Sequence, residues 1–135
     1  GVLDEQTMAA LEKDIDESHC GMLPESQFPA MVRVQQARDF AMAASLAPNA
    51  QQQLQVLIAG NYHIRRDLGV PNYLLNGQSS LEESQIVSLA FMEVDEASND
   101  PIDYLQQFGS VKAYDYIWFT PAVSAEDYCA SLRQQ

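Results

Sequence analysis

The side chains best suited to chemistry lie together in one short stretch, GNYHIRRD, at residues 60–67. His63 can bind a metal or move a proton near neutral pH, and Tyr62 offers an oxygen ligand. Arg65 and Arg66 are the one adjacent basic pair in the chain, and neighbouring guanidinium groups bind carboxylates or phosphates. The stretch therefore predicts a site for an anionic or metal-containing ligand. The alternative is that His63 packs within a loop and the arginines pair with Asp67.

A second candidate pair, His19 and Cys20, lies in a turn bounded by Gly21 and Pro24. A histidine beside a cysteine can serve a metal or a nucleophilic site. The alternative is a histidine that caps a helix and a cysteine with a structural role. Cys129 is the only other cysteine, and two cysteines at this spacing match no zinc motif. They could form one bridge in an oxidising compartment or remain two buried thiols.

The elements that must position these side chains alternate between helix and strand after two leading helices. Apolar spacing predicts helices over 7–18 and 26–46, then near 67–76, 99–109 and 124–135, and strands over 54–60, 85–94 and 114–120. Such alternation predicts the α/β class, with a parallel or mixed sheet of about three strands and flanking helices. So thin a sheet, behind two helices, indicates either a single domain over 1–135 or the C-terminal part of a larger α/β fold.

The predicted fold also says where a ligand should bind. Ligands of open α/β sheets bind outside the carboxyl ends of the strands, where Gly60, Asn61, Tyr62 and His63 follow the first predicted strand. The charge narrows the class of ligand. With 19 acidic and 7 basic residues the formal charge is −12, which argues against nucleic acid and against anionic membrane surfaces. The chain contains no phosphate-binding or dinucleotide-binding glycine motif.

Four segments resemble one known family. HCGMLP at 19–24, MVRVQQARDFAMAASL at 31–46, LIAGNYHIRRDLGVP at 57–71 and YDYIWFTPAVSAEDYC at 114–129 are similar to motifs of the ChaN family of haem-binding, iron-regulated lipoproteins. The resemblance implies an α/β fold about twice as long as this chain. It also implies haem as cofactor, held at the carboxyl edge of the sheet near the interface of a homodimer.

Site roles follow from the resemblance residue by residue. His63 matches the family histidine, and Asn61, Arg65 and Asp67 match its neighbours. Tyr62 fills a variable position, and we predict that Tyr62 or His63 binds the iron. Arg65 or Arg66 would neutralise the propionates, and we include His19 among the haem-binding residues.

The resemblance further predicts a haem-uptake protein rather than an enzyme. It predicts a Cys20–Cys129 disulfide and a bacterial periplasmic or outer-membrane location, with the membrane reached only through an N-terminal lipid anchor outside this chain. Two alternatives remain open. One is a metal-dependent hydrolase of the wider Tiki and TraB superfamily that uses His63 and His19. The other is an interaction module whose arginines bind an acidic partner.

Overall fold

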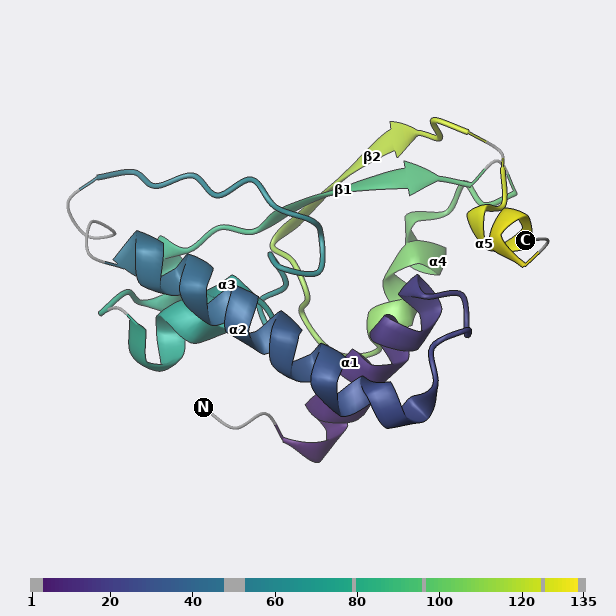
Figure 1. Cartoon of the computed structure of the whole chain (residues 1–135). Coiled ribbons are helices and arrows are strands. Elements are labelled where there is room, and N and C mark those ends of the chain that lie inside the picture. Colours follow the sequence, from purple (N-terminus) through teal and green to yellow (C-terminus); the bar gives the residue numbers. More distant parts are fainter. Residues whose placement is uncertain (1–3, 48–52, 79, 96, 125, 134–135) are drawn as a thin grey trace.

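The computed structural model describes residues 4–47, 53–78, 80–95, 97–124 and 126–133. Helices dominate the first part of the chain and a small sheet the second (Figure 1). The α-helices are α1 (Glu5–Ser18), α2 (Phe28–Leu46), α3 (Val70–Tyr73), α4 (Pro101–Leu105) and α5 (Tyr128–Leu132). Short helical turns cover Glu25–Gln27, Leu74–Gln78, Glu83–Gln85 and Gln106–Phe108. The strands are β1 (Leu89–Val94) and β2 (Tyr116–Pro121).

The two long helices form where the apolar spacing predicts them. The α1 helix begins at Glu5, because the Asp4 side chain accepts a hydrogen bond from the backbone N–H of Thr7 at 2.7 Å. Leu11 and Ile15 of α1 pack with Val32 of α2 in one buried cluster. Ala43 of α2 forms a second cluster with Val70 and Leu74. The start of α3 and the residue after it therefore pack against α2.

The sheet has two strands rather than the predicted three. β1 and β2 run parallel, with Phe91 opposite Trp118. The predicted strand over 54–60 is wrong, because this segment is extended yet forms no ladder. Leu57 packs on the second buried cluster, and the Asn61 amide donates to the Phe91 carbonyl at 2.6 Å. That side chain takes a backbone acceptor of β1 that a third strand would need.

The predicted short helices and the other two predicted strands are present with different lengths. The strand predicted over 85–94 begins only at Leu89. Of the closing helix predicted over 124–135, α5 covers Tyr128–Leu132, and residues 125, 134 and 135 lie outside the described residues. All the helices lie on one side of the sheet in Figure 1. The α/β class is therefore confirmed, with a partial sheet. Among the described residues, no helix is both long and apolar enough to cross a membrane.

Candidate functional site

The stretch from Gly60 to Gly69 folds into a tight loop that returns to the start of α3. His63 N–H donates to the Gly60 carbonyl at 2.9 Å, and Val70 N–H donates to the His63 carbonyl at 2.7 Å. Gly69 is required by this close approach, because a β-carbon there would clash with the His63 carbonyl. The loop therefore fixes the backbone of Tyr62 and His63 against the helical core.

His63 pairs with an aspartate that the sequence did not single out. Its Nδ1 donates to Oδ1 of Asp39 on α2 at 2.6 Å, and the Asp39 side chain is 1% exposed. Burial raises the pKa of Asp39 to about 6, although the hydrogen bond from His63 acts against this shift. The amide nitrogen of Gln35, also on α2, lies 3.1 Å from Nδ1 and 3.4 Å from Nε2 of the same ring.

The spacing of residues in α2 could have indicated that Asp39 is buried and needs a partner. Asp39 lies seven residues after Val32 and four before Ala43, so the three share the buried face of the helix. A carboxylate on an apolar face requires a partner. The partner could not be read from sequence, because His63 is 24 residues away along the chain.

Both predicted arginines make ion pairs within the chain. Arg65 donates to both carboxylate oxygens of Asp67, at 3.0 and 2.8 Å, and to Asp14 of α1 at 3.0 Å. Its guanidinium carbon lies 5.3 Å from the centre of the Phe108 ring. The Asp67 pairing considered as an alternative is thus present for Arg65.

Arg66 connects the loop to the sheet. Its Nη1 donates to the Asp115 carboxylate at 2.7 Å and to the Ile86 carbonyl at 2.8 Å, and its Nη2 donates to the Glu83 carbonyl at 3.2 Å. Lys112 also contacts the Asp115 carboxylate, at 2.7 Å. The pKa of Asp115 is lowered, because hydrogen bonds from Lys112, Ser88 and Arg66 outweigh its desolvation.

A cavity of about 390 Å³ lies beside the loop, and we call it the Tyr62 cavity. Its wall is formed by α1, α2, the loop, β1, the turn Gln106–Phe108 and Tyr114, which precedes β2. It is lined by Asp14, Ile15, Glu17, Ser18, Gln35, Asn61, Tyr62, Arg65, Met92, Gln107, Phe108 and Tyr114. Of the predicted site residues, Asn61, Tyr62 and Arg65 line this cavity, whereas His63, Arg66 and His19 do not.

The two tyrosines of the cavity differ in their hydrogen bonds. The Tyr114 hydroxyl donates to the Asn61 carbonyl at 3.1 Å, and burial raises its pKa to about 12. The Tyr62 hydroxyl makes no hydrogen bond within the described part of the chain. Burial raises the Tyr62 pKa further, helped by the charges of Asp39 and Asp14. Both phenols therefore hold their protons at neutral pH. Of the two hydroxyls, only that of Tyr62 has no hydrogen-bond partner among the described residues.

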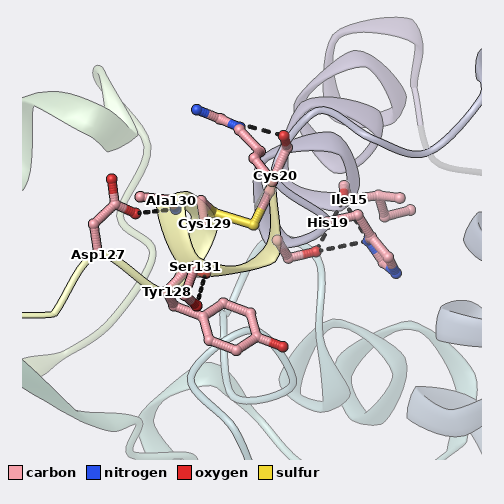
Figure 2. The surroundings of a disulfide bond; sticks show 10 residues. Ile15, His19, Cys20, Asp127, Tyr128, Cys129, Ala130 and Ser131 are labelled. Atoms are coloured by element: carbon pink, nitrogen blue, oxygen red, sulfur yellow. Dashed lines mark hydrogen bonds between the residues drawn. A yellow bond between two sulfur atoms is a disulfide. The ribbon is translucent and has the colours of Figure 1, made fainter. Parts of the chain in front are cut away.

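His19 and Cys20 lie at the end of α1, next to Cys129 of α5 (Figure 2). The His19 Nδ1 lies 2.7 Å from the Ile15 carbonyl and 3.2 Å from the Ser18 hydroxyl, so this histidine caps the helix. Cys20 forms the predicted disulfide with Cys129 of α5. His19 contacts Ile15 and Ser18, whereas His63 contacts Asp39, so the two histidines do not share a partner. No three His, Cys, Asp or Glu side chains are placed to hold a metal ion in the parts of the chain that the structure describes.

The loop, its buried histidine partner and the aromatic cavity all involve the segment for which a family can be assigned. The family model of the haem-binding uptake proteins, ChaN, of the Tiki superfamily matches residues 2–74. This match covers more than half of the chain, so the chain belongs to that family. No curated protein and no solved structure matches it.

The Tyr62 cavity fits some groups of haem and not others. Ile15, Met92 and Phe108 offer apolar contacts for a porphyrin face, and Tyr62 offers an oxygen donor for ferric iron. The propionates find no free cation in the wall, because the guanidinium of Arg65 is held by Asp14 and Asp67. The cavity therefore offers contacts for the apolar face and the iron of haem, and the haem propionates would lie toward solvent.

Proposed function

We propose that this chain acts in haem uptake by binding haem at the Tyr62 cavity. The observation that carries the proposal is the Tyr62 hydroxyl, which lines an aromatic and apolar cavity and is uncommitted within the described residues. A tyrosine oxygen is an established axial ligand of haem iron, as in catalase. The chemistry that haem supplies when bound is that of its iron, and the chain supplies binding and orientation.

The protein's own residues would prepare this site in three ways. The Asp14–Arg65–Asp67 ion pairs hold the loop against α1 and Phe108. The Tyr62 hydroxyl keeps its proton in the ligand-free chain, so the proton must leave when the oxygen binds iron. His63 is held by Asp39 behind the loop, where it positions the Tyr62 backbone rather than lining the cavity.

Other parts of the family resemblance enter the proposal as predictions. Asn61 and His63 would contribute by shaping the loop. Neutralisation of the propionates by Arg65 or Arg66 would require exchange of their present partners, and His19 would require movement of the end of α1. Binding near a homodimer interface, a lipid anchor and a periplasmic or outer-membrane location likewise remain predictions.

A haem titration tests the proposal. Ferric haem is added to the oxidised chain and the Soret band is followed, with Tyr62→Phe as the variant and Tyr114→Phe as a matched control from the same wall. We expect binding to weaken at least about tenfold in Tyr62→Phe, with loss of the phenolate-to-iron charge-transfer band, and to change little in Tyr114→Phe. An unchanged affinity and spectrum in Tyr62→Phe would refute the assignment.

One observation favours a second candidate, the metal-dependent hydrolase. A buried carboxylate hydrogen-bonded to a histidine ring, as Asp39 is to His63, is the arrangement found behind metal-binding and proton-transferring histidines. This reading predicts bound zinc or manganese in the purified protein and turnover of a peptide or ester, both lost in His63→Ala. A protein that binds haem and shows neither property excludes it.

A further inference from the structure

Gln35 of α2 belongs to both parts of the candidate site. Its side chain lines the Tyr62 cavity, and its amide nitrogen lies 3.1 Å from Nδ1 and 3.4 Å from Nε2 of His63. His63 itself does not line the cavity, although it directly follows Tyr62 in the chain. A cavity-lining side chain therefore covers the nitrogens of an imidazole that lies just behind the wall.

The His63 ring presents both of its nitrogens to α2. Nδ1 is held by the Asp39 carboxylate at 2.6 Å, one helical turn after Gln35. The opposite edge of the ring faces Gly60, where a β-carbon would lie 3.9 Å from Cδ2. Asp39 fixes the ring, so removal of the Gln35 side chain would open the second nitrogen, Nε2, toward the cavity.

The donors that line the cavity make this covering important. They are phenol, carboxylate, hydroxyl and amide groups and the Met92 thioether, and no imidazole is among them. A phenolate is negatively charged and is attracted more strongly by ferric than by ferrous iron, whereas a neutral imidazole binds haem iron in both oxidation states. A histidine held by a carboxylate, as His63 is, has the usual form of a metal-binding histidine. Access of His63 to the cavity would therefore reduce any preference for ferric iron.

We propose that Gln35 withholds the His63 imidazole from the Tyr62 cavity and thereby makes the site selective for ferric over ferrous haem. The inference rests on the proposed function for its ligand, and it adds the oxidation state that is bound and the residue that decides it. Selectivity is a difference between two affinities, so a side chain that excludes a competing donor raises selectivity without contacting the iron. Gln35 is thus a specificity-determining residue.

The covering of His63 is tested first, in the haem-free, oxidised chain. Diethyl pyrocarbonate acylates accessible imidazole nitrogens, and peptide mass spectrometry separates His63 from His19, the only other histidine. We expect His63 to react several-fold faster in Gln35→Ala than in the parent, with the rate at His19 unchanged. The matched control is Gln36→Ala, because Gln36 is also on α2 but contacts Met8 and does not line the cavity. Equal rates at His63 in the parent and Gln35→Ala would overturn the proposal.

The selectivity is tested with ferric haem and with haem reduced by dithionite. Electron paramagnetic resonance of the ferric complex should change from a high-spin to a low-spin signal in Gln35→Ala, because the imidazole becomes a second axial ligand. The ratio of ferric to ferrous affinity, from Soret titrations, should fall at least about tenfold. The double variant Gln35→Ala/His63→Ala should restore the high-spin signal, which would identify the new ligand as His63 rather than Met92. Gln36→Ala should behave as the parent does.

The outcomes separate this inference from the proposed function. A chain that binds haem through Tyr62, but keeps its spin state and affinity ratio in Gln35→Ala, overturns the inference and leaves the proposed function standing. A chain that binds neither form of haem refutes both. Circular dichroism of Gln35→Ala should match that of the parent, because alanine favours the helix at least as well as glutamine does.

Discussion

The buried aliphatic side chains larger than alanine all come from residues 4–74, whereas residues 80–133 bury only Ala90 and Ala113 among their apolar residues, in the part of the chain that the structure describes. The first region contains both buried clusters, and among the described residues of the second region only Ile86 packs against either. The family model likewise ends at residue 74. The first region has a core of its own, and the second is a layer added to it.

Polar and covalent ties hold the second region in place. Arg66 bonds to Asp115, the Ser88 hydroxyl donates to the Ile64 carbonyl, and the disulfide joins Cys20 to Cys129. The comparison teaches that burial stabilises the first region while specific contacts position the second. The cavity lies between the two, so its shape depends on both kinds of interaction.

The largest expected effect compares a buried side chain of the first region with an exposed side chain of the second. Leu11→Ala should destabilise the chain by about 2–5 kcal/mol, because Leu11 is fully buried and the substitution leaves a cavity. Ile102→Ala, in the exposed part of α4, should change stability by less than about 0.5 kcal/mol. Urea unfolding at low protein concentration measures both values. Equal losses would contradict the comparison.

The disulfide should rank next. It joins residues 109 apart, so its loss in Cys129→Ser frees a long loop in the unfolded chain and should cost about 2–4 kcal/mol. Amide exchange should rise most in α5, for which the described contacts to the first region are the disulfide and a 3.3 Å bond from Arg133 to the Cys20 carbonyl. Cys20→Ser is the control, since it should give the same pattern. Protection of α5 in both variants would show another anchor.

Arg66 should have a smaller effect that is specific to the junction. Arg66→Ala removes three hydrogen bonds, one of them to a carboxylate, and should cost about 2 kcal/mol while loosening residues 83–88 and 115. Arg33→Ala is the matched control, because Arg33 is exposed on α2 and has no ion pair among the described residues. Unfolding curves and amide exchange report on both. Similar unfolding and exchange in the two variants would show that Arg66 does not hold the second region in place.

The smallest expected effect is the contribution of Asp39 to the pH dependence of the unfolding free energy. Its pKa is raised to about 6 from 3.8, so the folded chain holds this proton over a range where the unfolded chain has lost it. Its contribution to stability should therefore be fully present below about pH 4 and fall as pH rises to about 6, by less than about 1.4 kcal/mol per pH unit. The measurement is the difference between unfolding free energies of the parent and Asp39→Asn across this range. A difference that does not vary with pH would exclude the shift.

The residues located the loop at 60–67, and the family resemblance predicted the disulfide, but neither gave the partners of the loop. Apolar periodicity predicted α1 and α2, and β-branched and aromatic runs predicted β1 and β2, because these signals are local. It could not show that Asp39 meets His63 or that Asp14 meets Arg65, since both contacts join residues far apart in the chain. It also placed a strand over 54–60, where the composition is strand-like but a side-chain hydrogen bond replaces the pairing.

The sequence by itself determined the class of the chain, its main helices and strands, its family motifs and the position of a polar loop after an apolar run. Only the tertiary structure decided what that loop does. It tied both arginines to carboxylates, turned His63 away from the cavity toward Asp39, and left Tyr62 facing the cavity. The physical reason is that secondary structure follows from neighbouring residues, whereas the availability of a side chain depends on which distant groups satisfy its charge and hydrogen bonds first.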